Sequence, residues 1–153
     1  MEKTFFAKII YFVLISTCFI SYSFSMKKSY FLPKANHHIT IFSSQKVPYI
    51  EWIAKGTKKA EGRVYSPFFR KLKVDDTVVF YNKKKDYVLC KITYLNIYRN
   101  FYMMLIGEGV ENMMPQTKSI NIAGKIYQSF SGANRVERYG ALAIGVHPIS
   151  SKY

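Results

Sequence analysis

Acidic residues and cysteines are scarce in this sequence. Its 153 residues include 9 Asp and Glu against 23 Lys and Arg, so the formal net charge is +14. From Lys3 through Ile50 there is not one acidic residue. Such an excess of positive charge favours a polyanionic partner, either nucleic acid or an anionic membrane, with a basic composition that serves solubility alone as the alternative.

Cysteine and histidine are too sparse for a disulfide framework or a metal site. Cys18 lies in an N-terminal apolar run and Cys90 in a strand-like run. If the leader is removed only Cys90 remains, which excludes an intramolecular disulfide. His37 and His38 are adjacent and His147 is isolated, with no Cys or carboxylate at ligand spacing, so we expect no metal. The sequence also has no Gly-x-x-x-x-Gly-Lys phosphate loop and no Ser-His-Asp ordering, and we expect no cofactor.

Residues 1–25 are predicted to be a leader outside the folded domain. Ile9–Ile20 is a mostly apolar run flanked by Lys3 and Lys8. It has the length of a signal-peptide core and falls short of the roughly 20 residues that a transmembrane helix needs. We therefore expect entry into the secretory pathway through a cleaved signal, with an uncleaved membrane anchor as the alternative.

The next segment, residues 26–37, is predicted to be a basic linker or a transit-like segment. It contains no acid and carries several lysines. A basic, acid-free stretch after a signal resembles the leader of proteins sent to a secondary plastid, so a plastid-like organelle is one predicted destination. If Met26 is the true start, the chain has no leader and the domain is cytoplasmic or nuclear. A chain of this length accommodates one domain, which we place at residues 38–149.

The most informative motif is Gly-x-Lys-x-x-Glu-x-Arg at residues 56–63. Glycine readily adopts the left-handed conformation that ends a helix, so Gly56 is predicted to terminate a helix that begins near Pro48. If Ala60–Val64 is extended, Glu61 and the arginine of the motif share one face, because strand side chains repeat every two residues. With the motif lysine at the turn before them, they form a compact polar site. A partly exposed ion pair without function is the structural alternative.

This constellation resembles the signature of the ASCH domain, the activating-signal-cointegrator homology family within the PUA-like barrels. Further blocks that resemble the family follow in the expected order, at Leu72–Phe80, Glu108–Pro115, Ile126–Phe130 and Tyr139–Ile144. Asp75 stands where the family usually has glycine. The resemblance implies an α+β fold, a small PUA-like β-barrel with flanking helices, whose ligand cleft is bordered by the turn that carries the motif.

The predicted elements fit that fold. Alternating and β-branched residues predict strands at His38–Phe42, Ala60–Val64, Thr77–Tyr81, Tyr87–Tyr98 and Tyr139–Val146. Asn100 is predicted to cap a helix over Phe101–Gly107. Ser119 is predicted to cap a second helix, whose apolar residues are Ile122, Ala123, Ile126, Tyr127 and Phe130.

The candidate ligand-binding residues lie in the motif and just after it. They are Lys58, Lys59, Glu61, Arg63, Tyr65 and Arg70. Lys58 and Arg63 could pair with phosphate or base edges, while Glu61 accepts hydrogen bonds from a base amine or orients Arg63. Tyr65, with the neighbouring Phe68 and Phe69, could stack on unpaired bases. The predicted function is therefore the binding of RNA or a nucleotide-containing ligand.

The resemblance leaves a hydrolase as the alternative, with Lys58 and Glu61 as the catalytic residues. Some relatives deacetylate a modified cytidine and others degrade single-stranded RNA. The amidohydrolase branch uses a threonine nucleophile three residues after the motif lysine, where this chain has Glu61. A carboxylate could activate water, yet the hydroxyl nucleophile of that branch is missing. We therefore favour a binding module over an enzyme.

Overall fold

A computed structural model of the chain describes residues 32–153. The predicted leader at residues 1–25 lies outside the described residues, as do residues 26–31 of the segment 26–37, so both stay predictions. The elements are β1 His37–Thr40, α2 Tyr49–Ala54, β2 Ala60–Val64, η1 Phe69–Lys71, β3 Thr77–Tyr81, β4 Tyr87–Tyr98, α3 Phe101–Glu108, α4 Val110–Met113, α5 Ile120–Gln128, η2 Ala133–Arg135, α6 Val136–Tyr139 and β5 Ala141–Lys152. Between residues 32 and 153, no helix has the length and apolar character needed to cross a membrane.

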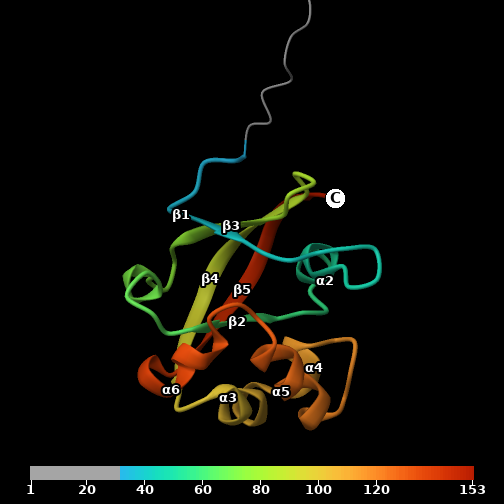
Figure 1. Cartoon of the computed structure of the whole chain (residues 1–153). Coiled ribbons are helices and arrows are strands. Elements are labelled where there is room, and N and C mark those ends of the chain that lie inside the picture. The colour runs from blue at the N-terminus through green and yellow to red at the C-terminus, as the bar shows by residue number, and fades with distance from the viewer. Residues whose placement is uncertain (1–31) are drawn as a thin grey trace, which may run out of the picture. The chain divides into compact units, whose positions relative to one another are not determined.

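The strands form one curled sheet with the order β1-β3-β4-β5-β2 (Figure 1). β1 runs parallel to β3 and the other pairs are antiparallel. The long central pair β4–β5 shifts register twice, and such irregularities bend and twist a sheet. The result confirms the predicted α+β class with a barrel-like sheet.

The two edge strands, β1 and β2, approach each other without a backbone ladder in the described part of the chain. Instead Arg63 of β2 donates a hydrogen bond from Nη2 to the carbonyl oxygen of Thr40, the last residue of β1, at 3.1 Å. A side chain thus bridges the gap between the two edges. This gap is where the candidate site lies.

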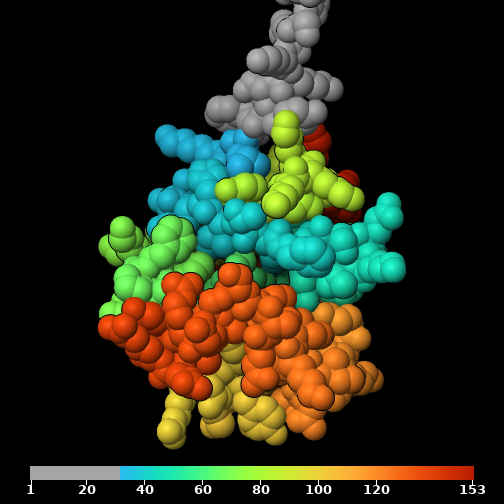
Figure 2. All heavy atoms as spheres, viewed as in Figure 1, coloured from blue at the N-terminus to red at the C-terminus, as the bar shows by residue number. Residues whose placement is uncertain are grey.

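The core fills the inside of the curled sheet and the space beneath its helices. Fully buried apolar residues of the central strands include Phe80, Val88, Ile92 and Ile144. Helices α3, α4 and α5 lie together near β2, while α2 packs against β4 and β5 (Figure 1). On the face shown in Figure 2, the blue-to-cyan segment that joins β1 to α2 meets the orange segment that follows α5.

Several predicted elements are confirmed to the residue. The strands at Ala60–Val64, Thr77–Tyr81 and Tyr87–Tyr98 have the predicted bounds. Asn100 caps α3 by accepting a hydrogen bond from the Met103 amide at 2.9 Å. In these segments local propensity and tertiary contacts favour the same conformation.

The first and last strands differ from the prediction. β1 ends at Thr40, two residues before the predicted end, and Phe42 is 64% exposed where the chain leaves the sheet. β5 starts at Ala141 because the residues before it form the short helix α6, which Gly140 ends at a φ of 81°. It runs on to Lys152 because the first residues of β4 provide a partner for its second half.

The apolar stripe of α5 is narrower than predicted. Ala123 and Tyr127 are buried, but Ile122 is 53% exposed and Phe130 lies beyond the end of the helix. Only one face of this nine-residue helix is covered, since it packs on α3 and η2.

Asp75, at the position where the family usually has glycine, has a φ of +74°. L-residues in this conformation are destabilised by roughly 1–2 kcal/mol, less for Asp, and glycine avoids the penalty. The exposed ion pair between Asp75 Oδ1 and Lys91 Nζ at 2.8 Å contributes about 0–1 kcal/mol.

We expect Asp75→Ala to lower the free energy of unfolding by about 1 kcal/mol, because alanine keeps a Cβ and loses the aspartate's tolerance of this conformation. Asp75→Gly should change it by less than about 0.5 kcal/mol. Urea denaturation measures both, with Lys91→Ala as the control for the ion pair. Equal losses for alanine and glycine would show that backbone conformation is not what limits this turn.

β1 is also fastened by His37, whose Nε2 lies 2.7 Å from Asp76 Oδ2. The hydrogen bond with His37 lowers the pKa of Asp76 below its usual value. A carboxyl with a depressed folded-state pKa stabilises the fold above its unfolded pKa, and that stabilisation is lost as the pH falls through the folded-state pKa.

We therefore expect the wild-type chain to lose more stability than Asp76→Asn between about pH 5 and about pH 2. Urea denaturation across this range is the measurement. Glu111→Gln, which changes an exposed acid on α4, is the control and should follow the wild-type profile. Parallel profiles for wild type and Asp76→Asn would contradict the role of this pair.

Candidate ligand-binding cavity

The motif begins with the turn between α2 and β2. Gly56 has a φ of +72°, as its predicted role requires, and its amide donates to the Ile53 carbonyl at 2.9 Å. An added Cβ at Gly56 would meet nothing within 4 Å, so the backbone angle alone favours glycine here. The Lys58 amide then donates to the Trp52 carbonyl at 3.0 Å, which turns the chain into β2.

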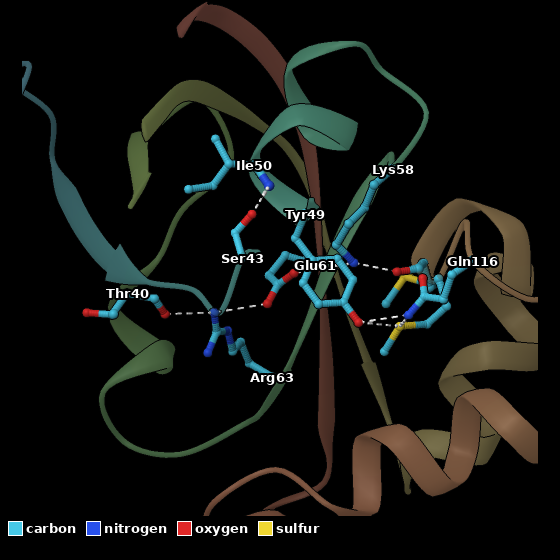
Figure 3. A network of polar contacts seen from close by, with 10 residues as sticks. Thr40, Ser43, Tyr49, Ile50, Lys58, Glu61, Arg63 and Gln116 are labelled. Carbon is cyan, nitrogen blue, oxygen red and sulfur yellow. Dashed lines mark hydrogen bonds and ion pairs between the residues drawn. The ribbon is translucent and has the colours of Figure 1, made fainter. Parts of the chain in front are cut away.

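The Lys58 side chain points into the protein and is fully surrounded (Figure 3). Its ammonium donates to the carbonyl oxygen of Met113, lies 3.3 Å from Glu61 Oε2 and sits 5.3 Å from the centre of the Tyr49 ring. Burial lowers the pKa of Lys58, while the Glu61 carboxylate opposes that shift by favouring the ammonium form.

These contacts correct the predicted role of Lys58. An ammonium has three donors, and here a carbonyl, a carboxylate and an aromatic face surround it. The residue is 2% exposed, so it is not the open phosphate-binding cation that the sequence suggested. It borders the cavity as part of the wall, and joins the end of α4 to β2.

Glu61 and Arg63 lie on one face of β2, as predicted, and form an ion pair of 2.9 Å between Oε1 and Nη2. Glu61 is 7% exposed and its second oxygen faces Lys58. The Arg63 guanidinium also lies over the Phe69 ring, 5.9 Å from its centre. With the bond to Thr40, these contacts fix the guanidinium in one orientation (Figure 3).

A cavity of about 250 Å³ lies beside this group. Its lining residues come from β2, from the segment after β1, and from the helices α2, α3 and α5 with the residues that follow them. They are Ile41, Phe42, Tyr49, Lys58, Glu61, Gly62, Arg63, Val64, Phe101, Met114, Tyr127, Phe130, Ser131 and Ala133. One wall is charged and the others are mainly aromatic, which is typical of a small-molecule or nucleobase site.

Two buried polar atoms of cavity-lining residues have no hydrogen-bond partner in the described part of the chain, namely Arg63 Nε and the Tyr127 hydroxyl. Tyr127 is 2% exposed and stacks on Phe101, with ring centres 4.9 Å apart. Burial, with the Glu61 carboxylate as the next cause, raises the pKa of the Tyr127 hydroxyl well above its usual value. The Tyr127 hydroxyl is therefore a hydrogen-bond donor at neutral pH, and the Nε–H group of an arginine side chain can only donate.

Tyr127 packs against Gly62 of β2. A Cβ at Gly62 would lie 2.5 Å from the Tyr127 hydroxyl oxygen and 2.7 Å from the Met104 methyl group. Only glycine therefore lets the tyrosine reach the strand.

The hydroxyl of Tyr49, a residue of the cavity lining, accepts a hydrogen bond from Gln116 at 2.9 Å and donates to Met114 Sδ at 3.2 Å (Figure 3). Burial raises the pKa of Tyr49. This tyrosine is thus held in place by protein groups, in contrast to Tyr127.

Three of the predicted binding residues lie outside the cavity lining, namely Lys59, Tyr65 and Arg70. Lys59 is exposed, and its backbone carries bonds to Asn112 and Val146. The Tyr65 ring faces the Arg70 guanidinium, 5.3 Å from the ring centre, instead of the cavity. The sequence reasoning missed Phe42 at the cavity, and took Tyr127 and Phe130 for core residues.

Among residues 32–153, no group of three or more His, Cys, Asp or Glu side chains is placed to hold a metal ion. The Glu108 carboxylate, which accepts hydrogen bonds from Tyr94, Asn96 and Tyr98, is saturated by these neighbours. The lining of the cavity consists instead of charged, aromatic and aliphatic side chains.

Comparisons with known proteins agree with this architecture. A family model described as ASCH domain matches residues 44–150. The crystal structure of the hypothetical protein PH0355 is similar with a TM-score of 0.64 and 34% identity, over 74% of this chain and 98% of that one. The NMR structure of protein PF0455 from Pyrococcus furiosus is similar with a TM-score of 0.58 and 26% identity, over 74% of this chain and 96% of that one. The crystal structure of ASCH from Zymomonas mobilis shares the fold with a TM-score of 0.50 and 15% identity, over 74% of this chain and 70% of that one. No curated protein matches the chain.

We expect Lys58→Met to lower the free energy of unfolding by about 3 kcal/mol, because it leaves the buried Glu61 carboxylate and the Met113 carbonyl without their partner. Lys59→Met alters the exposed neighbour and should change it by less than about 0.5 kcal/mol. Urea denaturation of both variants is the measurement. Similar small effects of the two changes would contradict the structural role of Lys58 and favour the originally predicted exposed cation.

Proposed function

This chain belongs to the ASCH domain family, and from that premise we propose that it binds RNA or a nucleotide-containing ligand in the cavity beside Glu61 and Arg63. The observation that carries the proposal is that two residues of the cavity lining, Arg63 and Tyr127, each keep a buried donor, Nε and the hydroxyl, without a partner in the described part of the chain. A buried donor without a partner destabilises a protein by about 1–3 kcal/mol. A ligand that supplies acceptor atoms would remove that penalty for both groups.

The charges of the wall favour an acceptor-rich ligand. Lys58 and Arg63 carry two positive charges against the single negative charge of Glu61, so the constellation is positive by one unit. Carbonyl oxygens and ring nitrogens of a nucleobase, or the oxygens of a phosphate, match this field and the two donors. Glu61 takes the second of its predicted roles and orients Arg63.

The aromatic walls suit a flat ring. Phe101 and Tyr127 stack on each other inside the cavity, and the exposed Phe42 and Phe130 lie at its border. Stacking of a base on an aromatic side chain contributes about 1–3 kcal/mol and tolerates any base. The stacking residues we propose are thus Phe42 and Phe130, in place of Tyr65.

Binding accounts for the geometry better than hydrolysis does. Each oxygen of Glu61 already faces a cation, so the carboxylate would have to break an ion pair to take a proton from water. The threonine of the amidohydrolase branch is replaced by Glu61 itself. Hydrolysis therefore enters here as an outcome of the test below.

We expect Tyr127→Phe to weaken binding of a labelled single-stranded RNA by roughly two- to tenfold, as the loss of one hydrogen bond predicts. The same change should leave the stability equal or higher, because the hydroxyl has no partner in the protein. Fluorescence anisotropy and urea denaturation are the measurements. Tyr102→Phe, on the exposed side of α3, is the control and should change neither.

Unchanged affinity for Tyr127→Phe would contradict the cavity as the binding site. The same RNA, and an N-acetylated cytidine, should be assayed for turnover in parallel. Turnover that Glu61→Gln abolishes while binding persists would establish the hydrolase instead.

A further inference from the structure

Beside the cavity, four side chains form an alternating stack in the order Tyr65, Arg70, Tyr139, Arg138. The Arg70 guanidinium lies 5.3 Å from the centre of the Tyr65 ring and 5.9 Å from that of Tyr139. The Arg138 guanidinium lies 5.3 Å from the Tyr139 ring centre. We call this set the arginine–tyrosine stack.

The fold brings these residues together at the end of β2. Tyr65 follows the strand directly, and its amide donates to the Gly140 carbonyl at 2.9 Å, which places Tyr139 next to it. The short helix η1 brings Arg70 back over Tyr65, and α6 presents Arg138. The stack is therefore built from three segments that β2 and β5 hold in register.

The stack is continuous with the cavity. Glu61, Arg63 and Tyr65 are spaced two residues apart, so their side chains leave an extended chain on the same side. Arg63 lies over Phe69, the residue before Arg70. A ligand that extends out of the cavity past Arg63 therefore meets the stack next.

The charges of the stack are not neutralised by the protein. Within residues 32–153, the ion pairs of the acidic residues involve neither Arg70 nor Arg138, and both arginines are exposed. The two guanidinium groups share one ring, Tyr139, although like charges repel each other. A guanidinium that lies on an aromatic face keeps its edge N–H groups available for the paired oxygens of a phosphate.

We propose that the arginine–tyrosine stack binds the phosphate backbone of a nucleic-acid strand whose base lies in the cavity, so that the ligand is single-stranded RNA and not a free nucleotide. This inference rests on the proposed function of the cavity. Because guanidinium groups cover the tyrosine rings, the stack interacts with the phosphate charges and does not distinguish one base from another. It gives Arg70 its predicted role in binding, and makes Tyr65 the support of Arg70 in place of a base-stacking residue.

The test compares a short labelled RNA with a mononucleotide across a salt series. Arg70→Gln with Arg138→Gln should weaken the RNA at least tenfold and lower its salt slope by about 1.4, at about 0.7 for each lost phosphate contact. The affinity for the mononucleotide should not change. Tyr127→Phe should weaken both ligands and leave the slope unchanged.

Lys83→Gln with Lys84→Gln is the charge-matched control, in the exposed β3–β4 turn far from α6 (Figure 1). This double variant should keep the wild-type slope. Arg70→Lys with Arg138→Lys keeps the charge and should retain most of the slope, which separates a loss of phosphate contacts from a loss of folding.

Equal weakening of RNA and mononucleotide by the glutamine variants, or an unchanged salt slope, would overturn the role of the stack and leave the cavity proposal standing. If the glutamine variants lower the salt slope while Tyr127→Phe has no effect on affinity, the result would support the role of the stack and overturn the cavity as the binding site. If wild type binds neither probe, both proposals fail. Competition by polyglutamate as strong as that by RNA would overturn the assignment to a nucleic-acid backbone.

Discussion

The Glu61 carboxylate between Lys58 and Arg63 is the interaction on which the site depends. Through Lys58 it is linked to the Met113 carbonyl at the end of α4, and through Arg63 to the Thr40 carbonyl at the end of β1. Two cations could not share this buried place without the negative charge between them. One carboxylate thus joins a helix and both edges of the curled sheet, and so defines the cavity that they enclose.

The polar groups around Glu61 fall into two sets, those with a hydrogen-bond partner in the protein and those without one. Lys58, Glu61 and Tyr49 have their hydrogen-bonding capacity met by the protein, whereas Arg63 Nε and the Tyr127 hydroxyl do not. Buried polar groups in native proteins are nearly always paired, so these two donors are the groups that the proposed ligand would satisfy.

Sequence predicted the local features of this fold and missed those set by distant contacts. The strands at Thr77–Tyr81 and Tyr87–Tyr98, and the cap at Asn100, follow from alternation and capping that act over a few residues. The burial of Lys58 does not, because its carbonyl partner lies 55 residues away along the chain. Tyr127 read as one more apolar residue of a helix, since nothing in its neighbourhood reveals that the hydroxyl lacks a partner.

Glu61, the residue that departs from the amidohydrolase pattern, also accounts for the charge balance of the site. A threonine at the place of Glu61 would be a nucleophile, but its neutral hydroxyl could not compensate the charges of the buried Lys58 and the partly buried Arg63. A carboxylate there does compensate them, and it is this charge that lets Lys58 be buried and Arg63 be fixed. The substitution therefore exchanges a reacting group for an orienting one. Glu61 is thus a buried acid that holds an arginine beside the cavity, and the proposed binding of a ligand depends on that geometry.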